Sequence, residues 1–297
     1  MTCILASIMC RLYGFRSNEA TKVECTLVHA QNALLIQSQS DEIGRSHSDG
    51  WGIGYYEGQK PHVERSAAAA HHGLHFSNTA ERVYSQTVIS HVRLATVGTP
   101  AIENCHPFHW GGWVFAHNGT VQGIDTLRPE MTNELSVTHQ KSIAGSTDSE
   151  LLFHWLMQRL ANEQVVSESH CNSLSDAIAV VGNSLAELDS RCRRAMPEKL
   201  AKLNIVLTDG RMMIATRLRN SLHWTHRDGI RDCEICGIPH VEHQPGFQYR
   251  AVVIASEPVS HETWDAIPDA TVIAIDENIQ TRSTPIPGIE PASLELT

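Results

Sequence analysis

The sequence lacks an uninterrupted apolar run of the ~18–20 residues that a membrane-spanning helix needs, so we predict no membrane span. It also lacks an excess of positive charge, because 23 Lys and Arg residues stand against 33 Asp and Glu, a net charge of −10. Binding to nucleic acid or to anionic membranes rests on many Lys and Arg contacts, so we expect neither partner. The first nine residues have no basic start and only a short apolar stretch, too little for a secretory signal. These absences predict a soluble, cytoplasmic protein that acts on a small molecule.

The chain of 297 residues contains no internal repeat and no long Gly/Ser-rich or charged linker. We therefore predict one domain over residues 10–277. Residues 278–297 are polar and Pro-rich without an apolar period, which indicates an extended tail. Residues 1–9 are interpreted as a leader or a misassigned start.

Strands and helices are expected in separate blocks, which favours an α+β layered fold over a doubly wound one. Asp209-Gly210 is typical of a type I′ hairpin between two antiparallel strands. Helical periodicity follows residues 23–34, then 151–160 after the capping box Thr147-x-x-Glu150, then a stripe from about Ser175. Short β-branched runs predict strands at 87–92, 113–116, 203–208, 211–216, 250–255 and 271–275.

Cys10 follows Met9 directly, as at a translation start with a small second residue. Removal of Met9 would give Cys10 a free α-amino group with a pKa of about 7.7–8, a base close to its own thiol. Such a residue combines nucleophile and base. The alternative, which this dipeptide alone favours, is an ordinary buried thiol in a first strand.

Three further segments carry groups with both a chemical and a structural interpretation. Arg93, at the end of a strand, suits a substrate carboxylate or a structural ion pair. Asn118-Gly119 is typical of a turn, but its side-chain amide and a backbone N–H also suit an oxyanion hole. Asp148 lies in the first turn of a helix, where the dipole stabilises it and where it could receive an ammonium group. Together with a Cys10 nucleophile, these groups suffice to hydrolyse the side-chain amide of glutamine.

The chain resembles the class II glutamine amidotransferases, which are N-terminal nucleophile hydrolases. The resemblance extends from Cys10 to about Pro258, and its motifs are specific in this order and spacing. They are Met9-Cys10-Arg11, Asp49-Gly50-Trp51-Gly52, the segment from His91 to Thr96, Glu103-Asn104-Cys105-His106-Pro107-Phe108, His117-Asn118-Gly119, the segment from Ser146 to Glu150 and Ser256-Glu257-Pro258.

The resemblance implies a four-layer αββα sandwich of two antiparallel sheets, with Cys10 as the nucleophile at the start of a strand. It implies that Arg93 and Thr96 bind the α-carboxylate of the substrate and that Asp148 binds its α-ammonium group. Asn118 and the Gly119 N–H would hold the oxyanion. No cofactor is implied. The glycines of the segment 49–52 are interpreted as shaping the backbone.

The chain has no room for a synthase domain after about Pro258, so it is similar to the small stand-alone branch that includes amidotransferase-like proteins of glutathione degradation and ergothioneine assembly. We therefore expect hydrolysis of a γ-glutamyl amide, either glutamine or a γ-glutamyl thiol compound, through a Cys10 thioester. A partner synthase or peptidase subunit is compatible with this branch. Two alternatives stay open, a glutaminase subunit that supplies ammonia to a separate synthase and a non-catalytic binding protein with a blocked Cys10.

A second motif lies near the C-terminal end of the expected domain. Cys233 and Cys236 form a Cys-x-x-Cys-Gly knuckle, and His240 and His243 follow it. These are ligand types of a structural zinc site, but the strong pattern has two well-separated pairs and only one is present. Zinc and a reduced surface loop both stay open, and we assign no metal ligand from the sequence.

Overall fold

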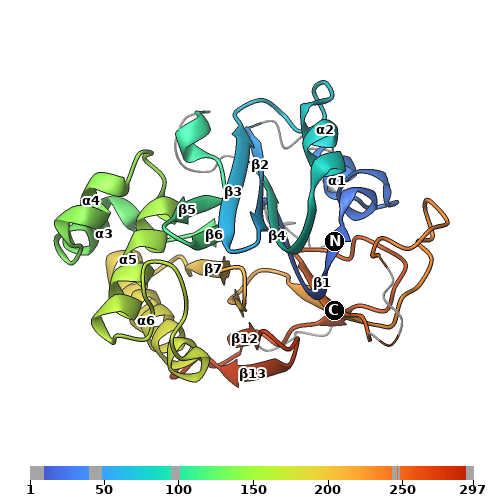
Figure 1. Cartoon of the computed structure of the whole chain (residues 1–297). Helices are drawn as coiled ribbons and strands as arrows, with labels where there is room; N and C mark the ends of the chain where they lie inside the picture. The colour runs from blue at the N-terminus through green and yellow to red at the C-terminus, as the bar shows by residue number, and fades with distance from the viewer. Residues whose placement is uncertain (1–9, 40–48, 95–100, 243–245, 247, 292–297) are drawn as a thin grey trace, which may run out of the picture.

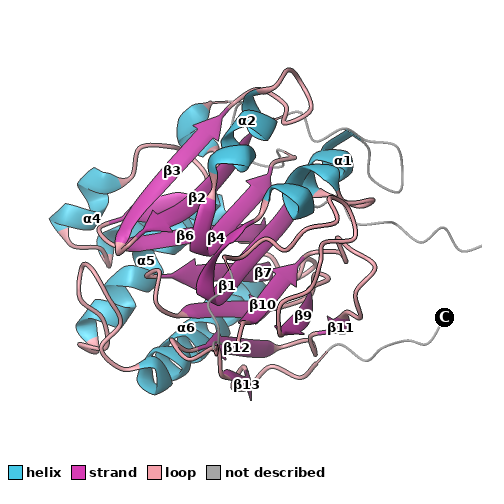
Figure 2. Ribbon diagram, turned by 45° about the vertical axis from the view of Figure 1, so that its right-hand side comes forward, coloured by secondary structure: helices cyan, strands magenta, loops and turns pink. Residues whose placement is uncertain are grey.

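Two antiparallel sheets packed face to face, with helices on both outer faces, make up the described chain (Figures 1 and 2). The computed structural model describes residues 10–39, 49–94, 101–242, 246 and 248–291. The predicted α+β fold with four layers is confirmed. Within the described residues, no helix combines the length and apolar character needed to cross a membrane.

The first sheet has the strand order β11-β9-β10-β1-β4-β2-β3. Its central strand β1 pairs antiparallel with β4 and β10, and the first rung joins Arg11 to Val92. The strands are β1 (Arg11–Lys22), β2 (Trp51–Glu57), β3 (Lys60–Ser66), β4 (Tyr84–Val92), β9 (His223–Asp228), β10 (Arg250–Ala255) and β11 (Asp265–Ala266).

The second sheet has the order β13-β12-β8-β7-β6-β5. Its strands are β5 (Phe108–Trp110), β6 (Trp113–Thr120), β7 (Lys202–Thr208), β8 (Met213–Arg217), β12 (Thr271–Ile275) and β13 (Thr281–Pro285). In β6 the register places Asn118 opposite Asn204 and Gly119 opposite Leu203. The candidate residues of β6 thus lie on a paired strand in the interior of this sheet.

The helices cover the two outer faces. The π-helical turn η1 (Cys25–His29), α1 (Leu34–Gln39) and α2 (His75–Arg82) accompany the first sheet. The second sheet is covered by α3 (Ile124–Asn133), α4 (Val137–Ser142), α5 (Asp148–Asn162) and α6 (Leu174–Ala195), and a short 3-10 turn η2 (Ile102–Asn104) precedes β5.

Three apolar layers separate the four structural layers. The middle layer joins the sheets, with Leu12 and Ile254 from one and Val206 and Ile273 from the other. The outer layers lie between each sheet and its helices. Because β1 has apolar neighbours on both faces, its first seven residues are all buried. A strand covered on both sides need not alternate between apolar and polar residues, and β1 is not among the strands expected from the β-branched runs.

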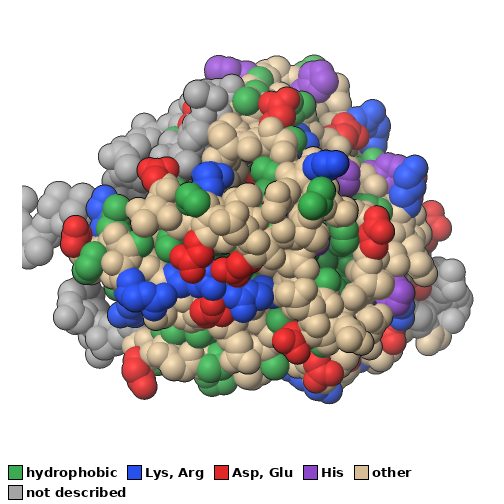
Figure 3. Space-filling view, turned by 90° about the vertical axis from the view of Figure 1, so that its left-hand side faces the viewer, with side chains coloured by type: hydrophobic (Ala, Val, Ile, Leu, Met, Phe, Trp, Pro, Cys, Tyr) green, Lys and Arg blue, Asp and Glu red, His purple; other side chains and the backbone are tan. Residues whose placement is uncertain are grey.

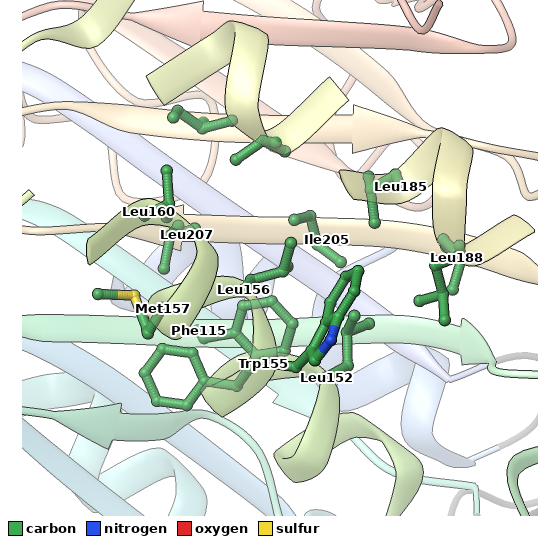
Figure 4. Close-up of a cluster of buried hydrophobic side chains, with 14 of the residues drawn as sticks. Phe115, Leu152, Trp155, Leu156, Met157, Leu160, Leu185, Leu188, Ile205 and Leu207 are labelled. Atoms are coloured by element: carbon green, nitrogen blue, oxygen red, sulfur yellow. The ribbon is translucent and has the colours of Figure 1, made fainter. Parts of the chain in front are cut away.

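The predicted helical stripes of α5 and α6 are confirmed. Figure 4 shows Leu156 and Leu185 on these helices directed toward Phe115 and Ile205 of the underlying strands. Thr147 caps α5 by accepting a hydrogen bond from the Glu150 N–H at 3.2 Å.

The outer side of this helical layer carries ion pairs over an aromatic side chain. Figure 3 shows Lys and Arg side chains gathered with Asp and Glu on this face. Among the helical residues, Arg159 and Arg191 each pair with Glu134 and Glu187, and the Arg159 guanidinium lies 4.5 Å from the centre of the Trp155 ring. The charged groups therefore close the apolar layer around Trp155 from outside.

Two local predictions were wrong. The periodic segment 23–34 is not one helix: a bond from the Ala30 N–H to the Cys25 carbonyl at 2.7 Å closes a π turn, and Ala30 is extended. The β7–β8 hairpin forms as expected, but Thr208 pairs with Met213, so its loop has four residues instead of a two-residue type I′ turn. Asp209 shapes this loop by accepting bonds from the N–H groups of Arg211 and Met212.

The segment from Asn278 onward contains an extended strand that belongs to the second sheet. β13 pairs along β12, and Ile286 is buried in the core beneath the helical layer. The extended tail that we expected from composition is thus partly integrated in the fold up to residue 291.

Replacing a buried leucine of α6 tests the outer apolar layer. Leu185→Ala should lower the free energy of unfolding by about 2–5 kcal/mol, because it removes a fully buried side chain and leaves a cavity. Leu200→Ala is the control, since Leu200 is 48% exposed and should change stability by less than about 0.5 kcal/mol. Urea unfolding of both variants gives the comparison, and equal losses would contradict the assigned core.

Candidate active site

Cys10 lies directly before β1 and is half-buried. Its Sγ donates to the Leu94 carbonyl at 3.3 Å and lies 3.2 Å from the Leu94 N–H, which donates to it. Burial raises the pKa of this thiol to about 11, although the Leu94 N–H, Arg93 and Arg11 act in the opposite direction. The thiol therefore needs a base to act as a nucleophile near neutral pH.

Arg93 is buried just after the end of β4, beside the segment 49–52. Its guanidinium donates to the Asp49 carbonyl at 3.3 Å, and its N–H donates to the Gly50 carbonyl at 2.8 Å. Gly50 has a φ of +125°, and a Cβ there would overlap the Cys105 sulfur. At Gly52 a Cβ would overlap the His106 carbonyl. These glycines therefore permit the close backbone approach that holds Arg93 in place.

Asn118 and Gly119 lie within β6, so the predicted Asn-Gly turn was wrong. The strand continues through them because β7 pairs opposite both residues. The Asn118 amide nitrogen donates to the Ser256 hydroxyl at 2.9 Å, which uses one of its two N–H groups. A Cβ at Gly119 would collide with the Lys202 carbonyl of β7, so only glycine fits this strand position.

Asp148 is buried at the first residue of α5. One carboxylate oxygen accepts from the Val121 N–H at 2.8 Å, and the other accepts from the Ser149 hydroxyl at 3.3 Å. A carboxylate has about four lone-pair positions, so these two bonds orient the group and leave capacity for a further donor.

Ser256 joins these elements, although the sequence reasoning gave it no role. Its hydroxyl accepts from the Leu12 N–H at 3.0 Å and from the Asn118 amide at 2.9 Å. Its own N–H donates to the Leu12 carbonyl at 2.9 Å. Next to it, Glu257 forms an ion pair with Arg11 at 2.7 Å. The only signal in the sequence was the motif Ser256-Glu257-Pro258.

The structure brings together most of the candidate residues. Arg93 and Asp148 both act electrostatically on the Cys10 sulfur. Asn118 is linked through the Ser256 hydroxyl to Leu12, two residues from Cys10. Thr96, the remaining candidate, lies outside the described residues. The arrangement places a thiol beside a buried cation, a buried carboxylate and an amide donor.

Comparison with known proteins identifies the family of the chain. The profile of the family described as "Glutamine amidotransferases class-II" matches residues 9–292. The chain is 24% identical over 303 residues to the probable glutamine amidotransferase DUG3 of Saccharomyces cerevisiae, covering 90% of this chain and 82% of that protein. It is 25% identical over 276 residues to the gamma-glutamyl-hercynylcysteine sulfoxide hydrolase of Mycobacterium tuberculosis, covering 91% and 94%.

Solved structures support the fold. A glutamine aminotransferase class-II domain protein from Silicibacter pomeroyi superposes with a TM-score of 0.62 at 18% identity, covering 94% of this chain and all of that one. The chain therefore shares the fold of these amidotransferase structures. The chain belongs to the class II glutamine amidotransferases and is an enzyme of that family.

Removal of the Ser256 hydroxyl tests the link between the sheets. Ser256→Ala should cost about 1–3 kcal/mol of stability, because the Leu12 N–H and the Asn118 amide lose a buried acceptor. Ser142→Ala is the control, since Ser142 is exposed at the end of α4 and its loss should be less than about 0.5 kcal/mol. Thermal or urea unfolding measures both, and an unchanged Ser256→Ala variant would refute the link.

Proposed function

We propose that the protein hydrolyses a γ-glutamyl amide through a thioester on Cys10. The observation that carries this proposal is the position of the Cys10 sulfur, which contacts the Leu94 backbone at 3.2–3.3 Å, directly after the buried Arg93. The buried Asp148 also acts electrostatically on this sulfur. A glutamyl group presents an α-carboxylate and an α-ammonium group, which are complementary to these two charges. The relatives named as a glutamine amidotransferase and a gamma-glutamyl hydrolase support the same substrate class.

Arg93 binds the substrate α-carboxylate in this proposal, together with Thr96. Its guanidinium is planar and carries several N–H donors, which suits paired hydrogen bonds to a carboxylate. Asp148 binds the α-ammonium group with the lone pairs that Val121 and Ser149 do not use. Charge complementarity at the α-carbon end would hold the glutamyl group so that its γ-carbonyl reaches the thiol.

The reaction then proceeds by acyl transfer. The Cys10 thiolate attacks the γ-carbonyl carbon, and the oxyanion accepts hydrogen bonds from the second Asn118 N–H and from the Gly119 N–H. The C–N bond breaks, and ammonia or an amine leaves after taking up a proton. Water attacks the thioester, which releases glutamate and restores the thiol.

The base in this mechanism is the α-amino group of Cys10 itself. With residues 1–9 attached, that nitrogen is an amide and cannot accept a proton, while burial keeps the thiol pKa at about 11. We therefore propose that the working enzyme begins at Cys10, through translation from Met9 or removal of a leader.

The free amine gives a prediction about pH. The kcat/KM of enzyme that begins at Cys10 should rise with pH through about 7.7–8, because only the deprotonated amine accepts the thiol proton. Enzyme that retains residues 1–9 should be slower by about 10²-fold or more, since it lacks this base. Glutamate release by both forms, with intact masses recorded beforehand, makes the comparison. Full activity in protein whose mass includes Thr2 refutes the assigned base.

Two substitutions separate chemistry from binding. Cys10→Ala should abolish glutamate release and labelling by a glutamine-mimicking diazoketone while the fold persists. Arg93→Ala should raise KM by about 10- to 100-fold, equivalent to roughly 1.5–3 kcal/mol, with a smaller effect on kcat, because the α-carboxylate is unchanged in the transition state.

Arg82→Ala serves as the control, because Arg82 is exposed and pairs with Glu64 on the surface. It should leave both kinetic constants unchanged. A panel of γ-glutamyl amides should be used for all variants, so that the preferred leaving group is identified at the same time. Retained turnover in Cys10→Ala would exclude the thioester.

A further inference from the structure

Four potential metal ligands meet at the opposite end of β1 from Cys10. The ligand atoms of Cys25, Cys233, Cys236 and His240 all lie within 4.8 Å of one another. We propose that these four side chains bind one Zn²⁺ ion as a structural site. Cys25 comes from the turn η1 after β1, and the other three come from the loop between β9 and β10. The site would thus connect two segments that are distant in sequence.

The distances suit a tetrahedral ion. With Zn–S bonds of about 2.3 Å and Zn–N bonds of about 2.0–2.1 Å, neighbouring ligand atoms in a tetrahedron are roughly 3.5–3.8 Å apart. Cys236 Sγ and His240 Nε2 are 3.2 Å apart, and no pair in the set exceeds 4.8 Å. Small side-chain movements therefore bring all four atoms onto one ion.

The backbone of the loop is already folded as a knuckle. The Ile235 N–H donates to the Cys233 sulfur at 3.4 Å, and the Gly237 N–H donates to the Cys233 carbonyl at 2.9 Å. Gly237 has a φ of +74°, which glycine adopts without strain. The Lys22 N–H donates to the His240 carbonyl at 2.9 Å, which positions the histidine over the end of β1.

The donor set selects the metal. Three thiolates and one imidazole form a known type of structural zinc site, whereas Ca²⁺ and Mg²⁺ prefer oxygen ligands. A divalent ion would replace the thiol protons and offset the mutual repulsion of three neighbouring thiolates.

The knuckle around Cys233 and Cys236 has little side-chain packing of its own, although Val241 and Tyr249 of the same loop are buried. Two cavities flank the cluster: Cys233 and His240 line one, and Cys25, Cys236 and His240 line the other. Ile235 and Ile238 are 45% and 62% exposed, so they add little to a core. An ion that joins the loop to Cys25 would supply the missing cross-link.

The site is separate from the chemistry at Cys10. Between them, β1 runs along β4 from Val92 to Tyr84, with a register shift between Arg16 and Thr21. This length of β4, at about 3.3 Å per residue, gives a separation on the order of 25–30 Å. The proposal therefore does not depend on the proposed hydrolase function. Metal content and glutamate release test the two independently.

The experiment measures metal in the full chain purified without chelator. Elemental analysis should find about one zinc ion per chain, and Co²⁺ added to metal-free protein should give the intense visible bands of a tetrahedral thiolate site. Cys236→Ser and Cys25→Ser should each lower zinc content and abolish the tetrahedral Co²⁺ spectrum. Cys236 is exposed, so its substitution should leave the rest of the fold intact.

Cys171→Ser is the matched control, because Cys171 is a free, half-buried cysteine outside the cluster. It should keep full zinc content and the Co²⁺ spectrum. Three outcomes would overturn the proposal: no zinc and no tetrahedral Co²⁺ spectrum in the native chain, metal that persists in both cluster variants, or a Cys233–Cys236 disulfide that forms in place of metal binding. The Co²⁺ titration of the native chain decides the question even if a variant fails to fold.

Discussion

The Ser256 hydroxyl lies between the two sheets and fixes their relative position. It accepts hydrogen bonds from the backbone of Leu12 in one sheet and from the side chain of Asn118 in the other. Both donors are in the interior, where an unpaired polar group is costly. A sliding movement of one sheet over the other would break a bond on one side. Buried polar groups must be paired throughout the core. This requirement therefore also fixes the position of β1, which follows Cys10, relative to β6, which contains Asn118.

A second physical constraint is the combined effect of burial and nearby charges on the ionisation of the Cys10 thiol. Burial opposes ionisation of Cys10, while Arg93, Arg11 and the Leu94 N–H favour it. Asp148 has the opposite effect to the two arginines on the same sulfur. In the proposed complex, a zwitterionic substrate would neutralise one group of each sign, Arg93 and Asp148, at the same time.

Much of this structure was accessible from the sequence, for identifiable reasons. The strands at 250–255 and 271–275 and the stripe of α6 have strong local periodicity or β-branched composition, and all were confirmed. The β-branched runs did not identify β1, because it is covered on both faces and includes Arg16 and Ser17, whose polar groups find partners only after folding. The family resemblance did place a strand at Cys10, and β1 begins at the next residue. Asn118-Gly119 was wrongly interpreted as a turn, because turn propensity depends on neighbouring residues in the sequence. Pairing with β7, which keeps both residues in a strand, depends on residues far away in the sequence.

The same distinction explains the two clusters of functional interest. Cys10, Arg93, Asn118 and Asp148 could be named from motifs, but Ser256 acquires its importance only from a contact with residues far away in the sequence. Likewise, the knuckle at Cys233 and Cys236 was visible, while Cys25 comes close only because η1 follows β1. His243, the other ligand considered, lies outside the described residues. Short motifs identify individual candidate residues, whereas the tertiary fold determines which distant residues complete a site.

The pairing of the central strand β1 with its neighbours bears on the proposed start of the enzyme at Cys10. Every described rung between β1 and its two neighbours involves Arg11 or a later residue, and the bonds of Ser256 begin at Leu12. A chain whose first residue is Cys10 retains all of these interactions. Under the proposal that the working enzyme begins at Cys10, none of these described contacts depends on a residue ahead of the new terminus.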